Sequence, residues 1–110
     1  MRGVKKTERQ REIVRRIREL IPMAPMSDFA AVKLLANAGH LRHLPPSISA
    51  RQAITSHVRH VHTDYDSLLK EGYDKDSARH FVLDAMNEKL TEWGSLFQIE
   101  NEPEDKLEDE

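Results

Sequence analysis

The stretch "HVRHVHTDYD", residues 57–66, contains three of the six histidines of the chain together with two aspartates. Imidazole and carboxylate groups bind zinc and transfer protons. The nearest approach to a ligand set is His57, His60 and Asp64, at positions i, i+3 and i+7 of a predicted helix. On a helical wheel of about 100° per residue, His57 and Asp64 lie on one flank of the apolar stripe and His62 on the other, while His60 points toward solvent. We therefore expect the three histidines to diverge and to bind no metal.

A structural zinc site usually takes four ligands, which are mostly cysteine and histidine. The chain has no cysteine, so His40, His43 or His80 would have to complete the set. His40 and His43 are three residues apart, which keeps a metal site open as the alternative. The simpler interpretation is that histidines flank a core stripe, with an apolar body and a solvated edge. On this basis we expect neither a metal nor another cofactor.

The sequence offers little for catalysis. Ser56 and Ser67 lie on the same predicted helix as the histidines, in no strained turn that would present a nucleophile. The chain has four glycines and no glycine-rich phosphate loop. Histidine–aspartate pairs at i, i+4 are no evidence for an active site, because any helix surface allows that spacing. These pairs are His60–Asp64 and His80–Asp84. We therefore expect no enzymatic activity.

Hydrophobic periodicity predicts an all-α fold, a small bundle of about four helices. The predicted helices cover about residues 8–21, 27–38, 50–71 and 75–93. Thr7 with Gln10, and Ser49 with Gln52, have the spacing of a capping box, while Ser27 and Asp74 suit the N-cap position. Glycines are expected to end the last three helices, at Gly39, Gly72 and Gly94.

Two of these helices carry informative apolar patterns. The third and longest has a seven-residue rhythm that predicts antiparallel packing, with Val61 near the centre of the buried stripe. The fourth has apolar residues over more than half of its circumference, which predicts a central helix that touches more than one neighbour. The third-helix stripe consists of Ile54, Val58, Val61, Tyr65 and Leu68.

The net charge of −2 conceals a strong asymmetry along the chain. Residues 1–20 carry a net charge of +5, and residues 100–110 carry −6. The acidic end is nearly free of apolar residues, which is typical of disorder. We therefore expect one helical domain over residues 1–99 and an acidic, disordered tail over residues 100–110.

The N-terminal helix is the candidate nucleic-acid-binding element. Basic residues before and along this helix form a row, and a row of this kind can follow a line of phosphates. The alternative is that Glu8, Glu12 and Glu19 pair with the arginines, as in a Glu12–Arg16 pair at i, i+4. The candidate contact residues are Lys5, Lys6, Arg11, Arg15 and Arg18.

Two functions therefore stay open, both non-enzymatic. The first is association with nucleic acid through the basic helix. The second is a protein-interaction or self-associating module, such as a homodimer, in which the apolar face of the fourth helix docks a partner through Met86 and Trp93. The chain has no apolar run long enough to span a membrane, so we expect no membrane span. We also expect no secretory signal, and the lack of cysteine fits a cytoplasmic location.

The region from "HVRHVHTDYD" through "GYDKDSAR" to the tryptophan before Gly94 resembles an uncharacterised family, the domain of unknown function 2293 of bacteria and fungi. The resemblance covers about residues 50–94, with a weaker echo in "REIVRRIRELIP". The segment "LANAGHLRHLPPSIS" departs from the family's glycine- and arginine-rich linker. The resemblance implies a compact helical module in a cytosolic setting, and it implies no catalytic residue.

Overall fold

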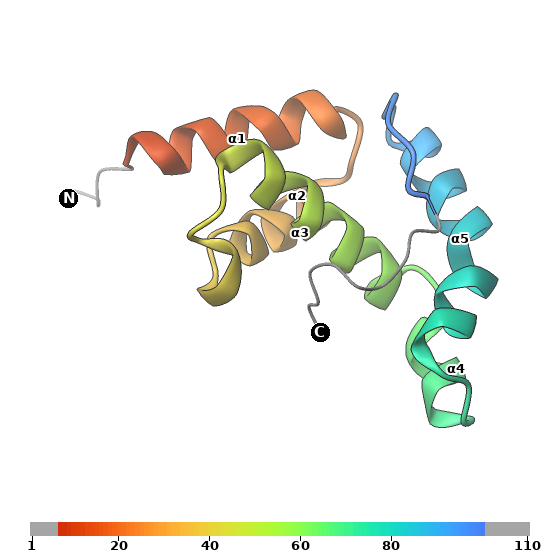
Figure 1. The fold of residues 1–110 in the computed structure, drawn as a ribbon. Coiled ribbons are helices and arrows are strands. Elements are labelled where there is room, and N and C mark those ends of the chain that lie inside the picture. The colour runs from red at the N-terminus through yellow and green to blue at the C-terminus, as the bar shows by residue number, and fades with distance from the viewer. Residues whose placement is uncertain (1–6, 101–110) are drawn as a thin grey trace.

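The computed structural model describes residues 7–100, which form α-helices and one short 3-10 helix and contain no strand (Figure 1). The predicted all-α class is confirmed, with five α-helices over this range where about four were expected. Lys5, Lys6 and all but the first residue of the expected acidic tail lie outside the described residues. The elements are α1 (Glu8–Leu20), α2 (Met26–Ala36), η1 (Gly39–Leu41), α3 (Pro46–Val61), α4 (Tyr65–Lys70) and α5 (Lys75–Glu92).

Helix α1 begins where its capping residues predict. The Thr7 side chain accepts a hydrogen bond from the Gln10 backbone N–H, and the Gln10 side chain accepts one from the Thr7 backbone, so the predicted capping box is confirmed. Ile13 and Ile17 are fully buried on its apolar face. The local sequence therefore determines where this helix starts and which of its faces is buried.

Helix α2 begins one residue before the predicted start. Pro25 occupies the N-cap position and no side chain caps the helix, so the prediction of Ser27 as N-cap is wrong. The helix ends at Ala36, before the expected stop at Gly39, which instead opens η1. Since Pro25 has extended backbone angles and no N–H to satisfy, it starts a helix without a capping side chain.

The predicted long third helix is broken into α3 and α4, which corrects the expected span of 50–71. Its start is also earlier, at Pro46 after Pro45, and Ser49 lies inside the helix, where its hydroxyl donates a hydrogen bond to the Leu41 carbonyl. At the break, the Thr63 hydroxyl donates to the Arg59 carbonyl and accepts from the Tyr65 backbone N–H. The Tyr65 N–H, which a continuous helix would direct to the Val61 carbonyl, donates to this side chain instead, so the helix breaks without glycine or proline.

The break changes which face of the predicted stripe is buried. Val58 is fully buried, but Val61 is 59% exposed at the end of α3, so its predicted place at the centre of the buried stripe is wrong. Tyr65 returns to the core at the start of α4. A wheel drawn through residues 62–64 is invalid because these residues do not continue the helix.

Helix α5 begins at the predicted residue and ends at Glu92, one residue before the predicted end. Asp74 caps it by accepting from the Ser77 backbone N–H, and Gly94 follows it with a φ of 82°. Its buried residues follow a narrower stripe than expected, because Phe81 is 59% exposed. The buried residues of α5 are Ala78, Val82, Met86 and Leu90.

The sequence suggested that the last helix would be central, but the central helix of the fold is α3. Figure 1 shows α3 crossing the molecule, with α1 and α2 on one side and α4 and α5 on the other. Helix α3 contacts all four other α-helices, while α5 packs against α3 and α4, which confirms that it touches more than one neighbour. No helix among residues 7–100 has the length and apolarity needed to cross a bilayer.

Candidate functional site

Three polar side chains from separate parts of the chain meet where α2 begins and α3 ends. Asp28 lies in the first turn of α2, His57 lies one turn before the end of α3, and His62 is the C-cap residue of α3. The Nε2 atom of His57 lies 2.6 Å from Oδ1 of Asp28, and the Nε2 atom of His62 lies 2.7 Å from the same oxygen. The two imidazoles therefore converge on one carboxylate oxygen.

These three side chains are largely withdrawn from solvent. The exposed fraction is 7% for His57, 12% for Asp28 and 23% for His62. A buried polar group is costly unless it has a hydrogen-bonding partner, and here each of the three groups has one. His62 is the most exposed of the three, so the cluster opens to solvent on its side.

Trp93, the C-cap residue of α5, packs against both imidazoles. Its ring stacks on His57 with an interplanar angle of 27° and a centroid distance of 6.4 Å. It meets His62 edge to face, at 87° and 5.3 Å. The Met23 backbone N–H donates to the Trp93 carbonyl at 2.9 Å, which ties the segment before α2 to the end of α5. Three helix ends are thereby held together around the cluster.

The environment of Asp28 favours its ionised form. Burial is the largest single effect and raises the pKa of the Asp28 carboxyl. The hydrogen bonds from His57 and His62 and their electrostatic attraction together outweigh it and hold the pKa below its ordinary value of 3.8. The position of Asp28 in the first turn of α2 acts in the same direction, since a helix N-terminus stabilises negative charge. The cluster thus presents a carboxylate at neutral pH.

The expected divergence of the histidines is wrong for His57 and His62. On a continuous helix they would lie on opposite flanks of the stripe, but α3 ends at Val61 and the backbone of His62 leaves the helical path. From the sequence, the place of Asp28 in the first turn of a helix predicts only a favourable interaction with the helix dipole. Asp28 pairs with residues 29 and 34 positions later in the chain, and no local sequence pattern predicts such a pairing. The helix break is different, because Thr63 and Asp64 are residues typical of one.

The other candidate ligands do not join the cluster. His60 is exposed, and its Nδ1 lies 2.7 Å from Oδ1 of Asp66, where the sequence suggested Asp64 as its partner. Asp64 is exposed at the start of α4. Within residues 7–100, the only group of three metal-ligand side chains with ligand atoms within 4.8 Å of one another is Asp28, His57 and His62. The exposed histidines outside it include His40, His43 and His80.

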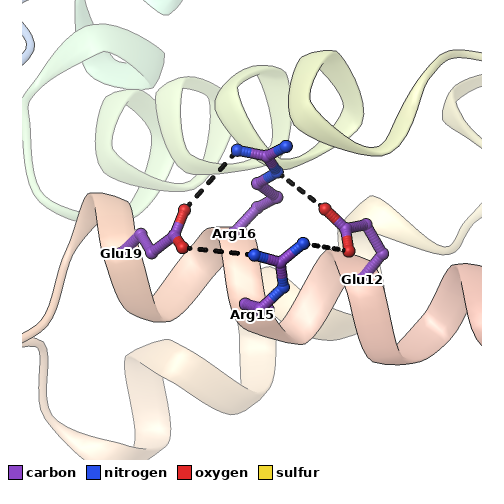
Figure 2. Close-up of polar contacts among 4 residues, drawn as sticks. All are labelled: Glu12, Arg15, Arg16 and Glu19. Carbon is purple, nitrogen blue, oxygen red and sulfur yellow. Dashed lines mark hydrogen bonds and ion pairs between the residues drawn. The ribbon is translucent and has the colours of Figure 1, made fainter.

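On the candidate nucleic-acid face, Arg11, Arg15 and Arg18 are all exposed on α1. Figure 2 shows that Arg15 belongs to a ring of two arginines and two glutamates. Arg15 contacts Glu12 and Glu19, and Arg16 contacts the same two glutamates, with a distance of 2.9 Å from its Nε to Oε2 of Glu12. The predicted Glu12–Arg16 pair is confirmed, and the formal charge of this ring is zero.

Two further arginines of α1 are engaged within the fold. Arg18 lies over the ring of Phe29, with its guanidinium carbon 5.3 Å from the centroid. Arg9, which the sequence did not single out, donates to the carbonyls of Leu41 and Leu44 and to the Ser49 hydroxyl. It therefore fastens α1 to the segment before α3.

The apolar docking face predicted on the last helix is not available to a partner. Met86 is 1% exposed and Trp93 is 3% exposed, since both pack into the core. The exposed residues of α2, by contrast, include no charged side chain, which holds for no other α-helix among residues 7–100. They are Met26, Ser27, Ala30 and Leu34.

Comparison with known proteins identifies the family of this chain. The family model described as "Uncharacterized conserved protein (DUF2293)" matches residues 16–94, which is more than half of the chain and extends from within α1 to the glycine after α5. The chain belongs to this family. The match includes Asp28, His57, His62 and Trp93, so the whole cluster lies inside the DUF2293 region. Neither a curated protein nor a solved structure gives a significant match.

Proposed function

We propose that this DUF2293 protein is a non-enzymatic module that associates with a second copy of itself through the exposed face of α2, defined by Met26, Ala30 and Leu34. The observation that carries the proposal is that this face is apolar and uncharged. Met26 is 77% exposed and Leu34 is 74% exposed. The exposed faces of the other α-helices all include charged residues, as expected for surfaces in contact with water.

The pattern on α2 suits a contact between identical surfaces. The three residues are four positions apart and lie on one face of the helix, with the small Ala30 between two long side chains. In a two-fold contact whose axis is perpendicular to the helices, the helices run antiparallel, so that Met26 of one copy faces Leu34 of the other and the two Ala30 residues meet at the crossing. A small residue at the crossing lets the helices approach closely, and no buried charge has to be desolvated.

The non-enzymatic part of the proposal rests on how the histidines are paired. In the described part of the chain, His57, His60 and His62 each pair with an aspartate, and none pairs with Ser56 or Ser67. Nucleophilic catalysis by serine needs a base within hydrogen-bonding reach of the hydroxyl. This arrangement therefore favours a binding role.

Sedimentation velocity over a wide concentration range tests the self-association. The expected result is a monomer–dimer equilibrium that persists when salt is added, because apolar contacts are not screened. Leu34→Glu should leave only monomer, since it places two carboxylates at the contact. Leu96→Glu is the matched control, because Leu96 is 100% exposed outside α2 and should leave the equilibrium unchanged. A wild-type chain that stays monomeric at the highest concentration would overturn the proposal.

A second candidate, association with nucleic acid through α1, is favoured by the exposure of Arg11, Arg15 and Arg18 on one face. The pairing of Arg15 with two glutamates weakens it. Fluorescence anisotropy with mixed-sequence DNA and RNA at low and physiological salt separates the two. Phosphate binding should weaken steeply with salt and be lost in the triple alanine variant of the arginines, whereas the preferred function gives negligible binding in both buffers.

A further inference from the structure

We infer that Asp28, His57 and His62 form a binding site for one divalent transition-metal ion of the zinc class, which links the start of α2 to the end of α3. The premise behind the sequence-based expectation of no metal was that the histidines diverge, and His57 and His62 do not. Two imidazole nitrogens and a carboxylate are a common ligand set for zinc and related ions. This site is separate from the exposed face of α2.

The three ligand atoms already lie close to one another. Both Nε2 atoms point at Oδ1 of Asp28, and all three ligand atoms lie within 4.8 Å of one another. Around a tetrahedral zinc ion, ligand atoms are about 3.3 Å apart, given metal–ligand bonds of roughly 2.0–2.1 Å. The separations of 2.6 and 2.7 Å from Oδ1 to the two Nε2 atoms therefore need to open by less than 1 Å, about the width that a side-chain rotation provides.

The same geometry explains how a metal replaces protons. An ionised carboxylate can only accept hydrogen bonds, so without an ion each imidazole carries a proton on Nε2 and donates it to Asp28. When an ion binds, each imidazole is neutral with its proton on Nδ1: an imidazolium loses its Nε2 proton to solvent, and a neutral ring loses the Nε2 proton while Nδ1 takes one up from water. The two Nε2 lone pairs and the carboxylate oxygen then become the ligands. No oxidation state changes, and the remaining coordination position is open to water on the exposed side of His62.

The surroundings of the cluster favour a cation. His57 and His62 lie at the C-terminal end of α3, where the helix dipole stabilises positive charge. Asp28 supplies a carboxylate that is only 12% exposed, so water competes weakly for it. Trp93 stacks on one imidazole and meets the other by its edge, which fixes the orientation of both rings before an ion arrives. A preorganised ligand set binds more tightly because less freedom is lost on binding.

The chain contains its own reporter for this site. Trp93 is the sole tryptophan of the sequence, and it contacts both histidine ligands. A change in tryptophan fluorescence during a titration therefore comes from the one indole that packs against this cluster. Cobalt(II) serves as a second probe, because its visible absorption distinguishes bound from free ion and its paramagnetism quenches a nearby indole.

The test is a titration of the full-length, chelator-treated chain with Zn²⁺ and with Co²⁺, followed by calorimetry and by Trp93 fluorescence. We expect one ion per chain, a fluorescence change that saturates at the same stoichiometry, and a rise in Tm of at least about 5 °C with excess Zn²⁺. Dilute protein is used, so failure of self-association leaves this result untouched. Absence of stoichiometric binding in the folded wild-type chain would overturn the inference.

Matched variants locate the ion. His62→Gln and Asp28→Asn conserve most of the volume of each side chain and should each weaken Zn²⁺ binding by more than about tenfold. His60→Gln is the control, because His60 also pairs with a carboxylate but stands outside the cluster. Far-UV circular dichroism establishes which variants are folded. Equal loss in His60→Gln and His62→Gln would place the ion elsewhere, and unchanged binding in a folded His62→Gln chain would also reject the site.

Should both cluster variants fail to fold, the wild-type chain still decides the question. The imidazole nitrogen resonances of a ¹⁵N-labelled sample distinguish a metal-bound Nε2 from a protonated one. Zn²⁺ should shift the Nε2 signals of His57 and His62 and leave those of His60 unchanged. A uniform response of the exposed histidines, with His57 and His62 unaffected, would overturn the inference.

Discussion

His57 and His62 are five residues apart, and their imidazole rings meet edge to face with centroids separated by 5.6 Å. The contact exists because α3 ends between them, at Val61. Both rings then reach Asp28, at the start of α2. On a continuous helix the two imidazoles would lie on opposite flanks. Because the backbone after Val61 is not helical, they lie together on one side of the polar cluster.

Loss of the Asp28 carboxylate should destabilise the metal-free fold. Asp28→Ala leaves the buried His57 without its hydrogen-bonding partner, and we expect a loss of about 2 kcal/mol in the free energy of unfolding. Asp66→Ala, which removes the exposed partner of His60, should cost no more than about 0.5 kcal/mol. Urea unfolding in the presence of a chelator measures both values, and equal costs would show that burial of the cluster has no energetic role.

The two valines near the end of α3 should respond in opposite ways to a charge. Val58→Asp buries an unpaired carboxylate at a fully buried position and should cost more than about 4 kcal/mol, enough to unfold a small domain. Val61→Asp should change stability by no more than about 0.5 kcal/mol, because Val61 is largely exposed. Thermal melts followed by circular dichroism compare them. Unfolding by the Val61 substitution would mean that the helix continues through residues 62–64.

Arg9 should matter for stability and not for binding. Its guanidinium donates to the Leu41 and Leu44 carbonyls and to Ser49, so Arg9→Ala should cost about 2 kcal/mol. Arg42→Ala is the control, since Arg42 is exposed, and it should be nearly neutral. Chemical denaturation gives both values. A neutral effect at Arg9 would indicate that α1 is held by its apolar face alone.

The two glycines with positive φ should differ in their tolerance of a Cβ atom. At Gly94, a Cβ would lie 3.0 Å from Sδ of Met23 and 3.2 Å from Cγ of Pro22, in addition to the strain of a φ of 82°. At Gly72, with a φ of 106°, no atom lies within 4 Å of the added Cβ. We expect Gly72→Ala to cost about 1 kcal/mol and Gly94→Ala roughly twice as much. Equal losses in urea unfolding would exclude a close approach between Gly94 and the segment before α2.

The ring of charges on α1 should make stability depend on pH. Hydrogen bonding from Arg15 is the largest effect on Glu12 and lowers its pKa, while burial, the second largest, raises it. The charge of Arg15 and the hydrogen bond and charge of Arg16 add to the lowering, so the pKa lies below its ordinary value of 4.5. The resulting stabilisation is present above pH 4.5 and is lost as pH falls through the lower pKa of the folded chain. Glu12→Gln should flatten the decline of Tm in this acidic window, while Glu88→Gln, at an exposed position on α5, should not. Added salt should reduce the difference.

The sequence by itself determined the helical class and the helix ends that depend on local chemistry. Thr7 with Gln10, Asp74 with the Ser77 backbone, and Gly94 after α5 all act within a few residues, so their roles can be read from spacing alone. The pairing of Glu12 with Arg16 is equally local. Membership of the DUF2293 family was also visible in the residues around the histidines, and the family match extends it to residue 16.

Only the tertiary structure decided where the polar cluster forms. The Thr63 side chain hydrogen-bonds to the backbone where α3 ends, although the apolar periodicity predicted one helix as far as residue 71. Because α3 ends there, Val61 lies at the surface. Asp28 meets His57 across 29 residues of chain, and its proximity depends on how α2 packs against α3. Packing of this kind sums many weak contacts between distant segments, so neither residue type nor spacing encodes it locally. The exposed, uncharged face of α2 became evident for the same reason, because an apolar helix does not indicate by its own sequence which side its neighbours will cover.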